Sequence, residues 1–364
     1  RAKNLHRPVF LHIETQKGKG YSYAEENPGE YHGTSGFDID TGKSFSSAST
    51  NFSNEFGLYL TELAKRDERI CAITAAMKYG TGLNHFSRAF GQQGRFFDVG
   101  IAEPHAVTFA GGLAANGMLP VFAVYSSFLQ RCYDQIIHDL SIEQQHVVIG
   151  IDRAGIVGSD GETHQGLFDV AMLSSVPGIT LYSPATYEEM RCSLYKSLYE
   201  HTGVCCVRYP RGGESKLPAF DPQVPWAIEP KGAKPRLLLV TYGKLSAQAV
   251  QAAQTLSQQG VPTAVLKLLR LLPFCEEAVE QAMQAEYVLF AEEGIESGGI
   301  GQMFGSRLLE NGFQGHYRVL AVHDRFVEQA TPDRALALCG LDAQSMVQTC
   351  TQWMKEQQTE DFDR

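Results

Sequence analysis

The chain has 364 residues, of which 43% are hydrophobic and 20% are charged, a balance that is typical of a globular protein with two or three domains. Its formal net charge of -10 argues against general binding to nucleic acid or to an anionic membrane surface. No apolar run approaches the length of about 18 residues that a transmembrane helix needs, so the sequence predicts no membrane span.

Eight cysteines occur without any C-x-x-C pair, and most lie inside apolar runs such as "RICAIT" and "VCCVRY". This pattern favours buried, reduced thiols and therefore a cytoplasmic protein. The first residues, "RAKNLHRPVFLHIETQ", have neither the charged start nor the apolar centre of a signal peptide, and they begin without Met. We therefore expect the chain to be the later part of a longer protein.

Residues 9–13 ("VFLHI") form the first predicted strand, and residues 17–53 form a long polar segment that we interpret as both linker and functional loop. Apolar runs of strand length then alternate with amphipathic helices. These runs are rich in Val, Ile and Phe without strict alternation, as in strands that are buried on both faces. The predicted strands are 69–74, 95–99, 119–125, 146–152, 179–184 and 204–209. The predicted helices are 54–67, opened by an asparagine cap, and 126–144.

Residues 212–235 interrupt this pattern with Pro, Gly and charge, as interdomain linkers do. The alternation then restarts. The further predicted strands are 236–242, 262–268, 287–293 and 317–322, and the further helices are 245–259 and one from about residue 300. The repetition predicts an α/β fold with two doubly wound, mainly parallel sheet domains. The predicted boundaries are 1–50 for a leading segment and linker, 51–213 for the first domain, 214–235 for a linker and 236–364 for the second domain.

Two glycine-rich stretches resemble nucleotide-binding motifs but have the wrong spacing. "GKS" at 42–44 follows Gly36 one residue too far for a phosphate-binding loop, and no strand precedes it. "GGIGQMFG" at 298–305 follows a strand and opens a helix, but no suitable acid lies on a following strand. We interpret the second stretch as a tight helix entry.

Ligands of open α/β sheets bind beyond the carboxyl ends of the strands, and four distinctive stretches fall there. In the first, "DVGIAEPHAVTFAGGLAANG" (98–117), Glu103 follows a strand and Pro104 begins a helix of small and apolar residues. An acid at this position can simply be stabilised by the helix dipole. The apolar neighbours Ile101, Ala106 and Val107 instead favour a functional carboxyl group with a perturbed pKa. This stretch alone supports both interpretations equally.

The second stretch, "YSSFLQR", places Tyr125, Phe128 and Arg131 after a strand. A phenylalanine there more often belongs to the core, but its ring could also stack on a flat heterocycle. The third stretch, "IDRAGIVGSDGETHQG" (151–166), is a glycine-rich loop of the kind that carries active-site residues. Its polar side chains include Arg153, Asp160, Glu162 and His164. Their spacing matches no tight metal-binding pattern, so a metal site is the weaker interpretation.

The fourth stretch, "VRYPRGG", carries Arg208 and Arg211 at the end of a strand. The guanidinium group presents a fork of donors that suits phosphate. Together with Arg153, and in a chain of negative net charge, these arginines favour a phosphorylated or carboxylated substrate.

In this order, the stretches resemble the signatures of the 1-deoxy-D-xylulose-5-phosphate synthases, which are thiamine-diphosphate enzymes of the transketolase class. The resemblance rests on "TQKGKGY", "YHG…FD", "FFDVGIAEPHAVTFAGGLA", "YSSFLQRCYDQIIHD", "IDRAGIVGSDGETHQGLFD" and "VRYPRG", and it runs through nearly the whole chain. It implies a transketolase-like pyrimidine-binding domain followed by a transketolase C-terminal domain. Pro104 stands where the family usually has Gln, which leaves the Glu103 carboxylate in place.

The resemblance implies a reaction and roles for individual residues. The reaction is condensation of pyruvate with glyceraldehyde 3-phosphate, with loss of carbon dioxide, to 1-deoxy-D-xylulose 5-phosphate, a precursor of isoprenoids, thiamine and pyridoxal. Glu103 would hydrogen-bond N1′ of the aminopyrimidine of thiamine diphosphate and so promote loss of the thiazolium C2 proton. Phe128 would stack on the pyrimidine, and Ile101 would shape the bent cofactor.

Other residues are expected at the same pocket through the same resemblance. Lys17, from the early loop, would contact the cofactor, and His32 and His164 would relay protons. The implied substrate-binding residues are Tyr125, Arg131, Arg153, Asp160 and Arg211, of which Arg153 and Arg211 would hold the phosphate of the acceptor.

Enzymes of this class hold the diphosphate through a metal, with a G-D-G motif and a later asparagine. The nearest stretch here is "SDG" (159–161), and the next asparagine after it is Asn311. We therefore expect Mg²⁺ and its ligands in an amino-terminal domain, either in the same polypeptide or in a separate chain, and poor cofactor binding by this chain alone. The family also implies a homodimer, to which the apolar helix at 103–117 would contribute.

Three alternatives stay open. A split transketolase, or the β subunit of a 2-oxo acid dehydrogenase, is a neighbouring enzyme, although "GSDGETHQG" and "VRYPRG" argue for the synthase. A non-catalytic assembly subunit would have lost the acid at position 103. A flavodoxin-like binding module would need a phosphate-binding first loop, for which "ITAAMKYGTG" is a poor match.

Overall fold

The computed structural model describes residues 1–32, 36–45, 50–158 and 160–362. The chain separates into two compact units, Arg1–Ser49 and Thr50–Arg364. Among the described residues, no helix has the length and apolar character that crossing a membrane requires. The eight cysteines are free, and only Cys192 and Cys339 are partly exposed, which confirms the prediction of mostly buried thiols.

The leading unit contains little regular structure. Its described helices are a 3-10 turn (Ala2–Asn4) and α1 (Ser22–Glu26). The rings of Tyr21, Tyr31 and Phe37 pack together with centroid distances of 5.3 to 5.8 Å. The predicted strand at 9–13 is wrong, because these residues pair with no strand in the described part of the chain and Phe10 is 92% exposed. An apolar run becomes a strand only where a neighbouring strand satisfies its backbone.

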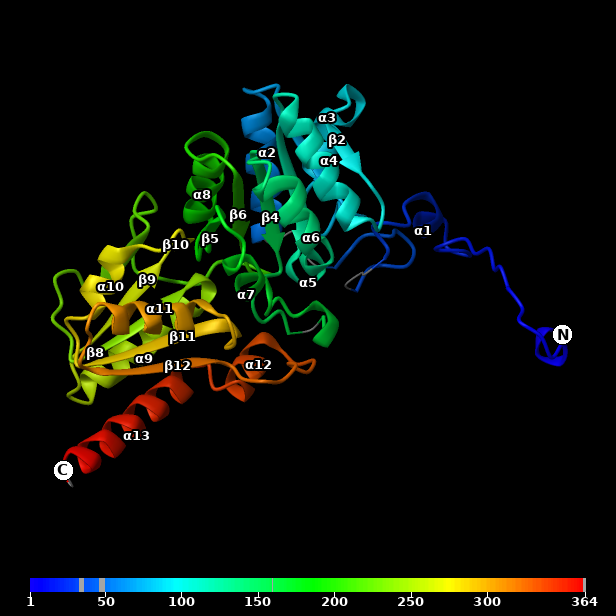
Figure 1. Ribbon diagram of the computed structural model, residues 1–364. Coiled ribbons are helices and arrows are strands. Elements are labelled where there is room, and N and C mark those ends of the chain that lie inside the picture. The colour runs from blue at the N-terminus through cyan, green and yellow to red at the C-terminus, as the bar shows by residue number, and fades with distance from the viewer. Residues whose placement is uncertain (33–35, 46–49, 159, 363–364) are drawn as a thin grey trace. The chain divides into compact units, whose positions relative to one another are not determined.

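The first sheet of the second unit has seven strands in the order β10-β5-β6-β4-β3-β1-β2 (Figure 1). Their bounds are β1 Ile70–Thr74, β2 Phe96–Asp98, β3 Leu119–Tyr125, β4 Val147–Asp152, β5 Thr180–Tyr182, β6 Val204–Arg208 and β10 Arg270–Leu272. All neighbours are parallel except β10 and β5. The chain leaves β1 toward β2 and then returns on the other side at β3. This reversal is the kind of position where open α/β sheets bind ligands.

Helices cover both faces of this sheet. On one face, the apolar cores of α2 (Phe52–Ala64), α3 (Asn84–Phe90) and α8 (Tyr187–Tyr199) form a cluster with β1, β3, β4 and β6. On the other face lie α4 (Glu103–Ala115), the segment that follows β3, and α7 (Asp169–Ser174). Helix α2 begins two residues earlier than predicted, because Asn51 rather than Asn54 is the cap: its Oδ1 accepts a 2.8 Å hydrogen bond from the Asn54 amide.

The single helix predicted over 126–144 is broken in the structure. The segment consists of α5 (Ser126–Leu129), a 3-10 turn (Gln130–Cys132), α6 (Tyr133–Gln135) and a π turn (Ile136–Ser141). Its buried residues keep helical spacing, which explains why the sequence predicts one helix. They are Leu129, Cys132, Ile136 and Leu140. The amide of Ile142 bonds to the carbonyl of Ile137, five residues back, at 3.0 Å. Periodicity alone cannot detect such a widened turn.

The second sheet has five strands in the order β12-β11-β8-β9-β7. Their bounds are β7 Trp226–Glu229, β8 Leu237–Tyr242, β9 Thr263–Leu268, β11 Tyr287–Ile295 and β12 His316–Val322. β7 lies inside the predicted linker and pairs antiparallel with β9, whereas the other pairs are parallel. The accompanying helices are α9 Ser246–Gln258, α10 Glu276–Ala282, α11 Ile300–Glu310, α12 Pro332–Leu338 and α13 Ala343–Phe362. The prediction of two doubly wound, mainly parallel sheets is confirmed.

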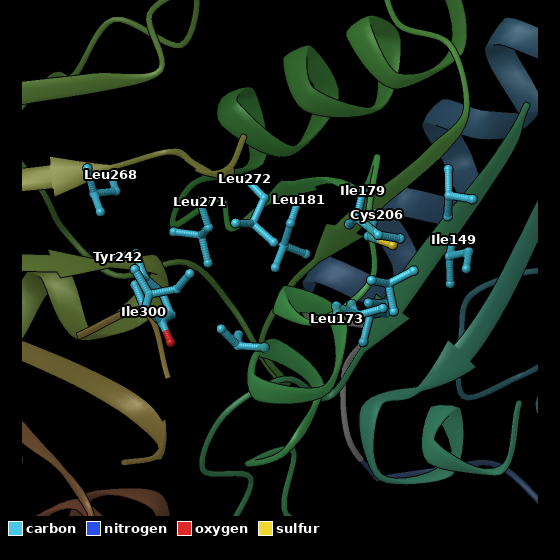
Figure 2. Packing of buried hydrophobic residues seen from close by; sticks show 14 of the residues in the cluster. Ile149, Leu173, Ile179, Leu181, Cys206, Tyr242, Leu268, Leu271, Leu272 and Ile300 are labelled. Atoms are coloured by element: carbon cyan, nitrogen blue, oxygen red, sulfur yellow. The ribbon is translucent and has the colours of Figure 1, made fainter. Parts of the chain in front are cut away.

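One apolar core continues from the first sheet into the second. β10 follows β9 in the chain but pairs with β5 of the first sheet. Figure 2 shows Leu271 and Leu272 of β10 between Leu181 of the first sheet and Tyr242 and Ile300 of the second domain. The two sheet domains are therefore joined by shared hydrophobic packing as well as by the connecting chain.

Candidate active site

A fixed turn holds Glu103 at the start of α4. β2 ends at Asp98, whose Oδ1 accepts hydrogen bonds from the amides of Ala76 (2.8 Å) and Gly100 (3.1 Å). Gly100 has a φ angle of +71°, which glycine adopts without strain. Pro104 then occupies the first turn of α4. The result is a carboxylate that is only 2% exposed.

The Glu103 carboxylate forms an ion pair with Arg131. Its Oε1 lies 2.6 Å from Nη1 of Arg131, whose side chain is 47% exposed. Ala106 and Val107 are buried, as the sequence predicts. Ile101 differs from the expected dry surroundings, because its side chain is 80% exposed. Helix α4 thus shields Glu103 from water, whereas the positive charge that pairs with Glu103 comes from Arg131, which solvent reaches.

Aromatic rings adjoin this ion pair. The Arg131 guanidinium lies 4.9 Å from the centroid of the Phe128 ring. Phe128 in turn stacks on Tyr125 with a centroid distance of 5.9 Å and meets His164 edge-on at 5.3 Å. Phe128 therefore connects the buried acid to the glycine-rich loop that carries His164.

Contacts with Gly80 and Arg153 hold the Tyr125 side chain in place. Its hydroxyl packs against Gly80 so closely that a Cβ there would lie 1.6 Å from the hydroxyl oxygen. The Arg153 guanidinium lies 3.9 Å from the centroid of the Tyr125 ring. Burial raises the pKa of Tyr125 to about 12, so this phenol is neutral near pH 7. No pattern in the sequence predicts the part that Gly80 plays.

Two arginines flank one carboxylate beyond Tyr125. Asp160 lies 3.4 Å from Nε of Arg153 and 2.8 Å from Nη1 of Arg211. Arg153 also donates a 2.9 Å hydrogen bond to the carbonyl of Gly80 and has a φ angle of +58°, which is uncommon for a residue with a side chain. Opposite charges thus alternate along this end of the cluster.

Asp152, the last residue of β4, was not predicted as a site residue. It is fully buried, its Oδ1 lies 3.4 Å from Nη1 of Arg153, and its Oδ2 has no hydrogen-bond partner among the described residues. Burial raises its pKa to about 6, against the opposing effects of Arg153 and a hydrogen bond from Ser53. The sequence feature that could have indicated Asp152 is its carboxylate at the end of the apolar run "HVVIGID".

The prediction that Arg208 helps to bind an anionic substrate is wrong. Arg208 is 4% exposed, and its Nε donates a 2.9 Å hydrogen bond to Asp169. Its Nη1 lies 3.2 Å from Oγ of Ser183, and its guanidinium lies 5.3 Å from the centroid of the Tyr242 ring. A buried arginine needs such partners, so Arg208 holds structure together inside the core.

Two of the remaining predicted residues belong to the leading unit. Lys17 and His32 contact each other through Nζ and Nδ1 within the leading unit, and both are exposed. Their place at the site stays a prediction. Ser159 of the "SDG" stretch lies outside the described residues, and Glu162 is exposed.

The helix entry at "GGIGQMFG" is occupied by the chain itself. Glu292 accepts hydrogen bonds from the amides of Ile300 (3.3 Å) and Gly301 (2.9 Å) and from the Tyr242 hydroxyl (2.7 Å). An internal carboxylate therefore takes the position that the phosphates of a dinucleotide would need.

The residues at Glu103 suit a flat, polar heterocycle. A buried carboxylate lies close to an aromatic ring, and the hydroxyls of Ser126 and Ser127, just before Phe128, are buried without a hydrogen-bond partner among the described residues. These features fit the aminopyrimidine of thiamine diphosphate. Within the described ranges, no group of three His, Cys, Asp or Glu side chains is arranged to hold a metal ion.

Comparison with known proteins gives the class. Residues 48–213 match the family model of the transketolase pyrimidine-binding domain, and residues 227–346 match that of the transketolase C-terminal domain. A solved structure titled split gene transketolase, inactive beta4 tetramer, has a TM-score of 0.71 at 26% identity and covers 84% of this chain and 98% of that one. The transketolase of Campylobacter jejuni, at 16% identity and a TM-score of 0.70, shares the fold over 85% of this chain and 48% of its own. The chain is a transketolase-class protein.

Curated relatives define the family within this class. The chain is 40% identical to the 1-deoxy-D-xylulose-5-phosphate synthase of Clostridium perfringens over 96% of its own length and 56% of that protein's. It is 40% identical to the synthase of Caldanaerobacter subterraneus over 98% of its own length and 57% of the relative's. The chain belongs to the 1-deoxy-D-xylulose-5-phosphate synthase family, and it spans a little over half the length of these relatives.

Proposed function

We propose that the chain supplies the pyrimidine-activating part of an enzyme that condenses pyruvate with glyceraldehyde 3-phosphate, with loss of carbon dioxide, to 1-deoxy-D-xylulose 5-phosphate. The observation that carries the proposal is one unbroken line of contacts from a buried acid to a pair of arginines. The line consists of Glu103, Arg131, Phe128, Tyr125, Arg153, Asp160 and Arg211, with His164 beside the rings.

Thiamine diphosphate, when bound, would supply the carbon nucleophile that takes up the two-carbon unit of pyruvate. Glu103 would hold a proton at N1′ of the pyrimidine, because a buried carboxylate at a rigid helix start has little freedom and little water around it. Phe128 would orient the pyrimidine by stacking. His164, in edge-on contact with Phe128, would move protons near the reacting carbon.

The arginines would bind the acceptor. Arg211 and Arg153 present guanidinium groups to one carboxylate, Asp160, and the same donors suit the phosphate of glyceraldehyde 3-phosphate. The neutral Tyr125 hydroxyl could donate to a substrate oxygen.

The diphosphate and Mg²⁺ would be held outside the described residues of this chain. The curated relatives are longer, so we propose that an amino-terminal region, in cis or as a separate chain, completes the site. The split-gene transketolase among the structural neighbours supports the proposal of a separate chain.

The decisive experiment assays this chain with and without the amino-terminal region of the Clostridium perfringens synthase. Pyruvate decarboxylation and formation of 1-deoxy-D-xylulose 5-phosphate are measured in the presence of thiamine diphosphate and Mg²⁺. We expect turnover only in the mixture. The matched control is the same mixture with Glu103→Ala, which should form the complex but lose turnover.

A second candidate is the β-type subunit of a split transketolase, favoured by the neighbour that this chain covers almost completely. A ketose phosphate offered as donor in the same mixture separates the two. Consumption of the ketose phosphate instead of pyruvate would favour the transketolase. An assembled complex that uses neither donor would point to a non-catalytic subunit.

A further inference from the structure

The glycine-rich loop of the first sheet domain is built into the second. Ile156 and Leu167, near its two ends, belong to the same apolar cluster as Leu239 and Ala291 of the second sheet. The amide of Ile295, the last residue of β11, donates a 2.9 Å hydrogen bond to the carbonyl of Leu167. The loop that carries Asp160 and His164 therefore takes its position partly from the C-terminal domain.

One carboxylate of the C-terminal domain touches the backbone of the loop directly. Glu293, on β11, is buried, and its Oε2 accepts a 3.0 Å hydrogen bond from the amide of Ile156. A Cβ on Gly155 would lie 2.3 Å from the same oxygen, so only glycine allows this approach. Gly155 also has a φ angle of +78°, which disfavours any side chain there.

Burying the Glu293 carboxylate is costly. Burial raises the pKa of the Glu293 carboxyl above its ordinary value, and this effect is opposed by the hydrogen bond from Ile156 and by the charges of Lys244 and Arg208. An apolar residue would fill this place in β11 at lower cost. The contact with the loop is the property that an apolar residue could not supply.

Gln165 and Gly158 make further contacts that hold the loop next to Ile156. Oε1 of Gln165 accepts hydrogen bonds from the amides of Val157 (2.8 Å) and Gly158 (3.4 Å). Its Nε2 donates to the carbonyl of Val327 in the second domain at 3.3 Å. A Cβ on Gly158 would lie 2.7 Å from the carbonyl oxygen of Ala330, so this glycine also packs on the C-terminal domain.

We propose that Glu293 is a positioning residue, through which the C-terminal domain holds the glycine-rich loop so that Asp160 stays between Arg153 and Arg211. The C-terminal domain thereby helps to set the geometry of the acceptor end of the site. The link to acceptor binding rests on the proposed function, whereas the link to loop position does not.

The first test measures hydrogen–deuterium exchange of this chain, with fragmentation that resolves the Ile156 amide. Glu293→Ala removes the acceptor, and we expect the Ile156 amide to exchange at least tenfold faster while amides of β4 and β11 keep their rates. Glu293→Gln keeps a side-chain oxygen acceptor and should restore most of the protection. Glu292→Ala is the matched control, because it removes the adjacent buried carboxylate, which bonds to α11 instead of to the loop.

Unchanged exchange at Ile156 in a folded Glu293→Ala protein would overturn the proposal. Equal acceleration in Glu292→Ala would also overturn it, since the effect would then be general loss of stability. In the complemented enzyme, Glu293→Ala should raise KM for glyceraldehyde 3-phosphate about tenfold with a smaller change in KM for pyruvate. If the unsubstituted mixture shows no turnover, the proposed function fails while the exchange result still decides the role of Glu293.

Discussion

Arg211 shows how the chemistry of a single side chain leads to a measurable expectation. It contacts Asp160 from the end of the line of site residues, and its guanidinium fork can bind two phosphate oxygens at once. Arg211→Lys keeps the charge and loses the fork. We expect KM for glyceraldehyde 3-phosphate in the complemented enzyme to rise about tenfold, as the loss of one charge-assisted hydrogen bond would produce.

The control for this prediction is Arg236→Lys. Arg236, just before β8, forms a two-pronged pair with Glu286, just before β11, so the same substitution removes a fork away from the site. An unchanged acceptor KM in Arg211→Lys, or the same rise in Arg236→Lys, would speak against phosphate binding by Arg211.

Asp152 gives a pH dependence with a definite sign. Its pKa is about 6 in the folded protein and 3.8 as the reference value for an exposed aspartate. An acid whose pKa is raised by folding stabilises the fold below pH 4, and this contribution is lost as the pH rises to 6. Since one pKa unit corresponds to about 1.4 kcal/mol, the full loss is about 3 kcal/mol.

Asp152→Asn removes this titration. We expect the free energy of unfolding of the variant, relative to the unsubstituted chain, to rise by up to about 3 kcal/mol between pH 4 and pH 7. Other buried acids cancel in this difference. Urea unfolding at both pH values is the measurement, and parallel pH profiles for the two proteins would contradict the assignment.

The sequence could predict a site residue where its chemical type contrasts with its neighbours. Glu103 stands out as an acid among small apolar residues, and it proves to be buried. Asp152 carries a similar signal, but an acid at the end of a strand is common. Arg208 and Arg211 are three residues apart, and only the packing of β6 shows that Arg208 points at a buried partner, Asp169. Sequence fixes the residue type, whereas the partner comes from tertiary structure.

At the scale of single elements, length and burial decided what could be predicted. The long strands β3 and β4 are rich in apolar residues, and their predicted bounds agree with the structure within one residue. β7 and β10 have four and three residues, and both pair antiparallel at sheet edges. Runs so short carry no periodic signal.

β10 allows a prediction about cooperativity. Leu271 is 1% exposed in the core that both sheets share. We expect Leu271→Ala to lower the free energy of unfolding by about 2 to 5 kcal/mol, because the side chain leaves a cavity that its neighbours fill only in part. Urea unfolding should still show a single transition, since both sheets lose contacts together. Leu309→Ala, at a position that is 75% exposed, is the matched control and should change stability little.

At the scale of the whole molecule, we predict self-association in solution. One face of α4 contributes Glu103, Ala106, Val107, Ala110 and Gly111 to the core, while His105 and Gly112 on the other side are exposed. The exposed Ile101 lies just before this helix. Light scattering at micromolar concentration should give twice the chain mass of 40.1 kDa. A mass of one chain would contradict the homodimer that the family resemblance implies.

The break in composition at 212–235 indicated that a second α/β domain follows, but it gave no sign that the two sheet domains share a core. The sequence predicts a linker at 214–235, whereas the structure places β7 within these residues. Composition describes each segment separately, whereas pairing between β5 and β10 depends on residues about ninety positions apart.

The pairing of β10 with β5 of the first sheet also limits how the two domains can be separated in evolution. A gene fission within residues 214–235 would leave the upstream product with an open sheet edge at β5 and the downstream product with an unpaired β10. Recombination that exchanged either half for a distant homologue would have to match this edge as well as the apolar surface around it. The two sheet domains should therefore be inherited together. Gene breakpoints that leave functional products should lie outside this pair of domains.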